Sequence, residues 1–553
     1  MDFFGLAFSD IVALFILIAL FITFAWLPRV FKRHFISLSP IQRHSLKDLF
    51  ILIFKNKEIR RRVLITIGIL IILRIMFFVP LPGINISALQ DFSGKIQNPS
   101  FLTKIELFTK MVRGLTIFSL GLMPFFSACL LLQLGSVFIP SLRRFTFGGE
   151  QGRNRLLRYT YILTILLSIF YAYILTSWIF KLSTFKEVNL VMLPAWQFRL
   201  ITIPILVGAV ILLLFIADII TKYGIGNGVA VIAVSYFPIK LLLAAKEMPI
   251  LYFQIKQISD GIVYSLIILL ILLILFIGII WGSFYFTRMG KIIKIRNKNF
   301  QENFIYLRPT IVGYIPLEWT VGWTNTIIFL SMTYAPFLKS SLFVHFLIPI
   351  IKCVLIFVLT YVYALIVFKP KYIQNLLKTY GVTVIEEDNR FIDRFLKYNL
   401  KKVLVFTGLF LIGAMFLPDL ITYLLKIPSY AIVSLFDWAV FIPFVGVISD
   451  IIQQLEFFKD KESSGIKTWS ICYIALGENE AEIKRAYLAS QGIPSLIEPL
   501  RFSWGMPVRT VVDQYRIYVP KDKKEIARNL ILKLDKRILK TKPIYIDRII
   551  STR

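Results

Sequence analysis

Long apolar runs separated by short polar or basic stretches fill most of the chain between residues 11 and 452. Many of these runs approach the roughly 20 apolar residues that a helix needs to cross a bilayer. The pattern predicts spanning helices at about residues 11–27, 62–79, 115–138, 159–180, 200–220, 228–245, 261–286, 311–336, 343–367, 402–424 and 431–452. The sequence therefore predicts an integral, polytopic membrane protein.

The pattern changes after Phe458, where the hydropathy falls and shorter apolar runs begin. These runs predict, in order, a strand at 469–476, a helix at 481–491, strands at 493–498 and 515–519, and a final helix at 523–534 that Asp522 could cap. About ninety residues are enough for a modest core. A small α+β domain, residues 458–553, is therefore predicted to follow the membrane helices.

The basic residues predict how the chain is oriented. The formal net charge is +31, and in a membrane protein such an excess first indicates Lys and Arg in cytoplasmic loops. Basic residues crowd the connection that follows the first span and then every second connection, whereas opposite connections such as 337–341 carry few charges. We therefore expect the N-terminus outside and the C-terminus in the cytoplasm. Anionic lipid and ribosomal RNA are possible partners of such loops.

Two short segments do not fit ordinary spanning helices. One contains Pro80, Pro82 and Gly83, and the other contains Gly121 and Pro124. The amphipathic stretch between them, residues 101–113, is too short and too charged to cross a bilayer, which predicts a segment that dips into the membrane and returns. Irregular backbone at membrane depth survives only where protein or a water-filled cavity covers it. The segments therefore predict a pore or a transport path, with an amphipathic helix on the membrane surface as the alternative for 101–113.

Four stretches carry a resemblance to a known family. They are residues 74–83; residues 117–133, with Gly121, Pro124, Ser127 and Gln133; residues 149–153; and residues 224–228. Taken together, residues 57–457 resemble the SecY family, the central subunit of the Sec protein-conducting channel. The resemblance implies an all-α polytopic fold, an inverted repeat of two five-helix halves (about 62–245 and 261–452) around a central pore. Residues 1–56, an extra helix with a basic linker, and the domain 458–553 lie outside it.

The resemblance implies a constriction of the pore lined by Leu122, Phe126, Val229 and Ala233. An apolar ring dewets when it is empty and so blocks ions, yet it offers a passing polypeptide no binding site. The alternative is that Leu122 and Phe126 are simply core residues of a helix. Two further ring positions depart from the family pattern, because they fall on Glu318 and near Pro443, and we leave both out of the ring.

The resemblance also implies a plug and a lateral gate. The plug would be residues 104–114, with Lys104, Phe108, Met111 and Gly114, and it would close the outer funnel of the resting channel. Ser127 and Gln133 would lie on one side of the gate, where small polar groups can bridge helices through bonds that break readily. Simple helix packing is an equal alternative for both residues. Such a gate lets apolar segments partition into lipid.

Two basic cytoplasmic loops, 287–308 and 369–402, correspond to the loops that dock the ribosome and the motor SecA in the family. The candidate docking residues are Arg288, Lys291, Lys294, Arg296, Lys378 and Arg390. The second loop lacks the family's Gly-Ile-Arg-Pro-Gly stretch and carries Glu386, Glu387 and Asp388 instead, which puts motor docking and the role of Arg390 in doubt. A solvated charged surface is the alternative for each residue.

The leading hypothesis is a channel that moves unfolded polypeptides across the cytoplasmic membrane and releases apolar helices into it. We predict no catalytic residue, metal or cofactor, because the three histidines and three cysteines are scattered and no phosphate-binding loop stands out. An ion-coupled secondary transporter using Glu318, Lys352 and Asp437 is the alternative, and an intramembrane enzyme is a third. A plug would discriminate, since neither alternative has a use for one.

Partners follow from the family. The resemblance implies small membrane subunits like SecE and SecG, the ribosome or the SecA motor, nascent or unfolded polypeptide, and membrane lipids. We expect the first helix to pack against the periphery of the channel. We expect the C-terminal domain to contact a partner or to regulate docking.

Overall fold

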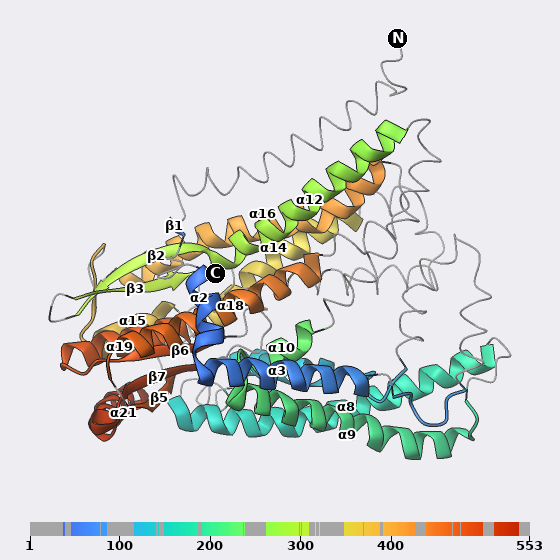
Figure 1. Cartoon of the computed structure of the whole chain (residues 1–553), viewed down its shortest axis with the longest axis horizontal. Coiled ribbons are helices and arrows are strands. Elements are labelled where there is room, and N and C mark those ends of the chain that lie inside the picture. Colours follow the sequence, from blue (N-terminus) through green and yellow to red (C-terminus); the bar gives the residue numbers. More distant parts are fainter. Residues whose placement is uncertain are drawn as a thin grey trace, which may run out of the picture. The chain divides into compact units, whose positions relative to one another are not determined.

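The structure is a computed structural model, and Figure 1 shows the whole chain. It describes residues 37–38, 46–77, 79–85, 115–139, 142, 149–185, 191–235, 237, 262–297, 299, 301–308, 316, 320, 348–368, 370–386, 391–425, 438–466, 468–475, 477–501 and 514–540. The chain divides into two compact units. The N-terminal unit comprises Ile51–Gly135 and Arg155–Tyr236, and the C-terminal unit comprises Met1–Phe50, Ser136–Asn154 and Phe237–Arg553.

Helices build the N-terminal unit. They are the end of α2 (Leu46–Lys55), α3 (Lys57–Met76), most of α6 (Met123–Phe138) and α8 (Gly149–Phe185), α9 (Ala195–Tyr223) and the short α10 (Gly228–Val234). The helix α3 begins at Lys57 because the side chain of Asn56 accepts hydrogen bonds from the backbone N–H groups of Glu58 and Ile59, at 3.0 and 3.4 Å. The helices cover most of the predicted spans in this unit.

One predicted span is corrected by the structure. The apolar run 115–138 is not a single helix, because α6 starts only at Met123 and residues 115–122 form turns. Gly121 has φ +51, a left-handed conformation that glycine adopts at little cost. The run looks uniform in hydropathy, but its first third is irregular backbone.

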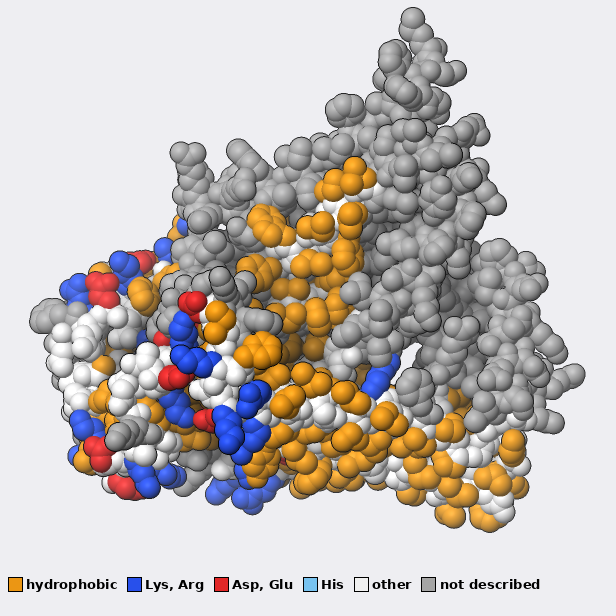
Figure 2. Space-filling view, viewed as in Figure 1, with side chains coloured by type: hydrophobic (Ala, Val, Ile, Leu, Met, Phe, Trp, Pro, Cys, Tyr) orange, Lys and Arg blue, Asp and Glu red, His pale blue; other side chains and the backbone are white. Residues whose placement is uncertain are grey.

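The outer surfaces of these helices are apolar. Leu166, Phe170, Leu200 and Phe215 are each more than half exposed, and hydrophobic side chains cover the helices of this unit in Figure 2. A water-soluble protein rarely exposes so much apolar area. Among the described residues, four helical stretches are long and apolar enough to cross a membrane: Asn154–Phe180, Ala195–Tyr223, Ile392–Phe416 and Phe441–Ser463.

The C-terminal unit has a helical part and a small sheet. Its long helices are α12 (Ile262–Arg288), α14 (Ile348–Val367), α16 (Ile392–Leu425) and α18 (Trp438–Ser463), with the short α15 (Pro370–Tyr380) after α14. Aromatic rings join them: Phe276 of α12 lies 5.3 Å from Phe441 of α18, and Phe286 stacks on Phe410 of α16 at 4.5 Å, between ring centroids. The predicted first span, 11–27, and nearly all of 311–336, including Glu318, lie outside the described residues.

The loop 287–308 is a β-hairpin. The strand β2 (Met289–Arg296) continues directly from α12 and pairs antiparallel with β3 (Glu302–Leu307). The other edge of β2 pairs with β1 (Ser37–Leu38) and β4 (Thr383–Val384). Ile293, Ile295, Ile305 and Leu307 are fully buried, so one face of the hairpin is apolar. Both loops predicted to dock partners therefore contribute strands to one sheet.

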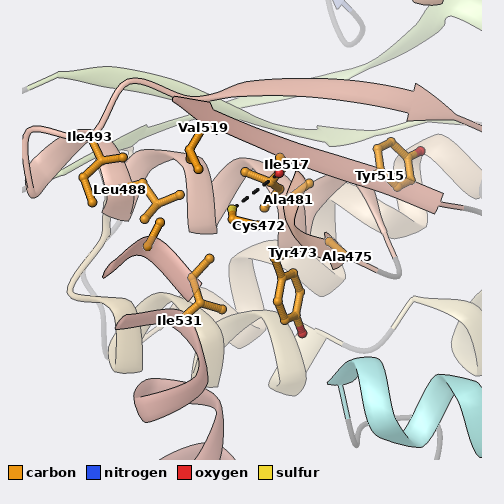
Figure 3. Close-up of a cluster of buried hydrophobic side chains, with 11 residues drawn as sticks. Cys472, Tyr473, Ala475, Ala481, Leu488, Ile493, Tyr515, Ile517, Val519 and Ile531 are labelled. Carbon is orange, nitrogen blue, oxygen red and sulfur yellow. Dashed lines mark hydrogen bonds between the residues drawn. The ribbon is translucent and has the colours of Figure 1, made fainter. Parts of the chain in front are cut away.

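The C-terminal domain has its elements in the predicted order. They are β5 (Trp469–Ala475), α19 (Glu478–Ser490), β6 (Leu496–Leu500), β7 (Gln514–Pro520) and α21 (Lys524–Lys540), and the strand order in the antiparallel sheet is β5-β7-β6. Figure 3 shows the core, in which Tyr473, Leu488, Ile517 and Ile531 meet. Asp522 lies within a 3₁₀ turn, Lys521–Lys523, so the last helix begins after it.

Candidate functional site

The proline-containing segment and the segment before α6 pair with each other. The backbone N–H of Leu81 donates to the carbonyl of Leu115 at 3.2 Å, and that of Ile117 donates to the carbonyl of Val79 at 3.2 Å. The N–H of Met192 donates to the carbonyl of Gly83, whose φ is +83. Leu81 itself is buried in an apolar cluster with Phe198 and Leu206. The irregular backbone is thus paired internally and covered by protein, as membrane depth requires.

The turn before α6 positions two of the predicted ring residues. The backbone N–H of Thr116 donates to the hydroxyl of Ser119 at 2.9 Å, and the turn closes just before Leu122. Leu122 and Phe126 lie one helical turn apart, on the same side of the helix start, and each is 7% exposed. Both residues are therefore fixed by local hydrogen bonds at the beginning of α6.

A glycine-rich turn positions the other two ring residues. Asn227 caps α10 by accepting a hydrogen bond from the N–H of Val229 at 3.2 Å. The N–H of Gly228 donates to the hydroxyl of Thr221 at 2.8 Å, which ties the turn to the end of α9. Val229 is buried and Ala233, one turn later, is half-buried. Leu122 is therefore the last residue of an anchored turn, and Phe126, Val229 and Ala233 lie in the first two turns of the helices that follow anchored turns.

The ring itself and the plug stay predictions. Lys104, Phe108, Met111 and Gly114 lie outside the described residues. Pro443 is a buried residue inside α18.

The two predicted gate residues lie on α6. The hydroxyl of Ser127 shares a hydrogen bond of 3.0 Å with the hydroxyl of Tyr171 on α8. This bond joins two helices of the same unit, as the packing interpretation expects. Gln133 is buried, with 5% of its surface exposed. Their role in a lateral gate stays a prediction.

The predicted docking residues carry acidic neighbours. On the hairpin, Lys291 lies 3.7 Å from Glu386, and Lys294 and Arg296 lie 3.9 and 3.7 Å from Glu302. Each pair is exposed enough for solvent to weaken it. The surface is therefore mixed in charge. Lys378 lies exposed in the last turn of α15, Arg288 ends α12, and Arg390 lies outside the described residues.

Sequence reasoning missed that the C-terminal domain lies against these loops. Asn479 of α19 donates to the carbonyl of Tyr306 at 3.2 Å and accepts from its N–H at 2.9 Å, so its amide pairs with the edge of β3. Asn297 and Asn299, at the hairpin turn, donate to the carbonyls of Ala486 and Ser490 at 3.2 and 3.1 Å. The partners are 173 to 191 positions apart in the chain, and no local pattern announces them.

A chain of four alternating charges extends through this contact. Arg308, which follows β3, lies 3.0 Å from Glu478 of α19. Arg501, which follows β6, lies 3.5 Å from Glu478 and 3.5 Å from Asp450 of α18. Burial lowers the pKa of Arg308, while the charge of Glu478 raises it in part. The domain thus supplies one acid and one base that link the hairpin to α18.

A second buried charge network lies between α19, α21 and α15. The ammonium of Lys484, 1% exposed, lies 2.7 Å from Glu480 and 3.0 Å from Asp535, and 3.7 Å over the ring of Tyr473. Tyr380 of α15 donates to Asp535 at 2.7 Å. Burial and then the charge of Asp535 raise the pKa of Tyr380, so its phenol stays protonated and donates.

Comparison with known proteins identifies similar chains. The SecY family model matches residues 116–452. The protein translocase subunit SecY of Thermus thermophilus is 28% identical over 423 residues, covering 72% of this chain and 92% of that protein. Those of Aquifex aeolicus (28%; 73% and 96%) and Escherichia coli K12 (26%; 68% and 86%) are similar as well.

Solved structures also resemble this chain. One is a SecY protein whose plug domain stabilises the closed state of the channel, with a TM-score of 0.48 and 15% identity over 78% of this chain and 98% of that one. Another, a protein-conducting channel, has a TM-score of 0.47 and 14% identity with the same coverage.

Proposed function

Since this chain belongs to the SecY family, we infer that it is the channel subunit of a protein translocase, which conducts polypeptides through a membrane. The single observation that carries this conclusion is the match of the family model across residues 116–452, which are more than half of the chain. Membership also gives the fold, the all-α inverted repeat of two five-helix halves. A channel subunit is not an enzyme in the classical sense, and the ion-coupled transporter is not favoured.

We propose that Leu122, Phe126, Val229 and Ala233 line the constriction of the pore. Their support is that each lies at the end of, or just after, a turn held by specific hydrogen bonds, so the starts of α6 and α10 are fixed in position. Fixed backbone with apolar side chains suits a seal, because side chains can shift around a polypeptide and return. The seal would then need no polar group that a passing chain could bind.

We propose that residues 104–114, with Lys104, Phe108, Met111 and Gly114, form the plug. The support comes from both ends of the surrounding segment. Leu81 and Leu115 are hydrogen-bonded to each other, so the chain that leaves after residue 85 is brought back to the same place at 115. A segment closed at its neck in this way can move as a loop without disturbing the helices on either side.

We propose that the hairpin and α15 receive the ribosome or a SecA-like motor from the cytoplasm. Lys294 and Arg296 expose 54% and 40% of their side chains, which supports contact with an anionic partner, and Lys291, Lys378, Arg288 and Arg390 belong to the same loops. The same proposal includes small subunits like SecE and SecG and a position in the cytoplasmic membrane with the C-terminus inside. It also includes lateral release of apolar segments past Ser127 and Gln133.

A crosslinking experiment tests the function. A cysteine replaces Phe126 after Cys129, Cys353 and Cys472 have been replaced, and a secretory precursor is stalled partway through the membrane. We expect a crosslink that depends on the signal segment of the precursor. A cysteine in place of Leu166, which is 58% exposed on α8, is the control and should not react. Crosslinks at Leu166 but not at Phe126 would contradict the pore assignment and return the transporter hypothesis to consideration.

A further inference from the structure

The C-terminal domain contacts three separate elements of the channel: the β2–β3 hairpin, α15 and α18 (Figure 1). We propose that this domain is a permanent brace, which holds both predicted docking loops and the end of α18 as one rigid platform while the channel works. This inference rests on the proposed function, because it concerns the loops that would receive a partner. The competing arrangement is a lid that leaves the loops when a partner arrives.

The first support is the way in which α19 closes the edge of β3. An exposed strand edge presents unpaired N–H and C=O groups to any other chain. Here the amide of Asn479 takes both backbone groups of Tyr306, as a neighbouring strand would, and Arg485 donates to the side chain of Asn303 at 3.2 Å. Removal of the domain would leave this edge open to wrong partners. The pairing of Asn479 with the edge of β3 therefore supports a domain that stays in place.

The second support is the chain of charges from Arg308 to Asp450. Arg308, Arg501 and Asp450 expose only 8%, 3% and 6% of their side chains. A buried charge is tolerated when its partner is in place, and breaking the pair by taking one partner away is strongly unfavourable. Glu478 is in contact with both arginines. A domain that left the channel would break the chain at both of its ends.

The third support is the contact of the sheet with α18. The side chain of Gln454 donates to Glu498 of β6 at 2.9 Å, and Glu498 also accepts from Tyr518 at 2.9 Å. The ring of Phe457 lies 5.1 Å from that of Tyr518. Glu498 is 1% exposed and its hydrogen-bond partners come from both sides of the contact. This contact has the burial of a protein core.

These contacts must break together if the domain is to leave. Domains of one chain usually move relative to each other unless the interface between them is large and well packed. Here Tyr380 of α15 packs edge-on against Tyr487 of α19 at 5.3 Å, next to the Lys484 network, while the hairpin and α18 hold two other sides. Three simultaneous anchors favour a brace over a lid.

The brace has a mechanical consequence. Arg308 directly precedes the predicted span 311–336, and through Glu478 and Arg501 it is tied to α18. A partner that pushes on the hairpin would therefore move Arg308 and the contacting part of α18 together. The partner would meet the exposed side chains of Lys294 and Arg296, because the edge of β3 is already occupied by the domain.

A reversible disulfide tests whether the domain must leave. Asn299 and Ser490, whose side chain and carbonyl are 3.1 Å apart, are both replaced by cysteine in a chain without native cysteines, and each single variant serves as a control. We expect the oxidised channel to translocate a precursor at the rate of the reduced one. Translocation that stops on oxidation and returns on reduction would overturn the brace in favour of a lid. Two thiols that react with maleimide but that neither oxidation nor a short bis-maleimide joins would overturn the contact itself.

Hydrogen exchange of the unmodified chain provides a second measurement. The N–H of Tyr306 is bonded to Asn479, so its exchange reports whether the domain opens. We expect protection within about tenfold of that of Ile517, in the core of the domain. Exchange about a thousandfold faster at Tyr306 than at Ile517 would overturn the brace. Joining of the two cysteines and hydrogen exchange at Tyr306 both report on the contact without any activity. A reduced channel that fails to translocate would therefore count against the proposed function and not against the brace.

Discussion

The hydroxyl oxygen of Thr66 on α3 accepts a hydrogen bond of 2.8 Å from the backbone N–H of Ile225, 159 residues further along the chain. Thr66 in turn donates to the carbonyl of Arg62 at 3.1 Å, and the guanidinium of Arg62 donates to the carbonyl of Gly224 at 3.4 Å. One face of α3 therefore holds the turn from which α10 starts. The position of Val229 depends on this contact between two distant parts of the sequence.

The first prediction concerns Gly228, which begins α10. A Cβ atom there would overlap the backbone of Ala217 in α9, which is no flexible side chain and has to shift. We expect Gly228→Ala to lower the free energy of unfolding by about 1–3 kcal/mol, as overpacking does. Gly208→Ala on α9 is the control, because nothing lies within 4 Å of its added Cβ. Equal melting temperatures for the two variants in detergent would contradict the close approach.

The second prediction concerns the constriction. Replacing Leu122 by Ser puts a hydroxyl where the proposed seal is apolar, so water and ions should enter the resting channel more readily. We expect ion conductance to rise by about tenfold, which corresponds to a barrier lowered by about 1.4 kcal/mol. Leu131→Ser, half exposed on the helix α6 that follows Leu122, is the control and should leave conductance unchanged. A leak that is the same in both variants would argue against Leu122 as a ring residue.

The third prediction concerns Cys472 in the core of the C-terminal domain. Burial raises the pKa of its thiol to about 12, whereas a thiol in an unfolded chain titrates near 8.5. The folded state therefore prefers the protonated thiol, so this stabilising contribution is complete below pH 8.5 and is lost as the pH rises toward 12.

Alkylation measures this difference. With Cys129 and Cys353 replaced, we expect iodoacetamide at pH 8 to leave Cys472 unmodified in the folded chain and to modify it in denaturant. A cysteine in place of the exposed Ser463 is the reactive control. Rapid alkylation of Cys472 under native conditions would mean that the core in Figure 3 opens readily.

Much of the fold follows from the sequence because its strongest signals are local. A run of about 20 apolar residues marks a span wherever it occurs, as in α9, and the alternation in β7 and the helical spacing in α19 gave the order of the C-terminal domain. The same reasoning fails at residues 115–122, because a buried turn is as apolar as a buried helix. Only Gly121, followed by Pro124, marks the difference.

The contacts of the site depend on parts of the chain that are far apart. Ile293 and Ile295 alternate with Lys294 and Arg296, and this alternation is typical of a strand. The prediction for the loop 287–308 used only its charge. No such signal exists for Asn479, whose partner is 173 residues away, because an asparagine near the start of a helix resembles any solvated residue. The docking of the domain is therefore visible only in the structure.

The last prediction concerns Glu478, which lies between Arg308 and Arg501. Glu478→Gln removes the acid and leaves two buried guanidinium groups side by side. Loss of one partner from a fully buried pair costs about 3–5 kcal/mol, and we expect about 2–3 kcal/mol here because Glu478 is 22% exposed. Glu525→Gln, an exposed acid on α21, should change the free energy of unfolding by less than about 0.5 kcal/mol.

The additional change Arg308→Met should restore part of the stability that Glu478→Gln removes, because it takes away one of the two facing charges. If the effects of Glu478→Gln and Arg308→Met simply add in a double-mutant cycle of thermal unfolding, the two residues do not act as a pair, and the chain of charges does not link the hairpin to α18.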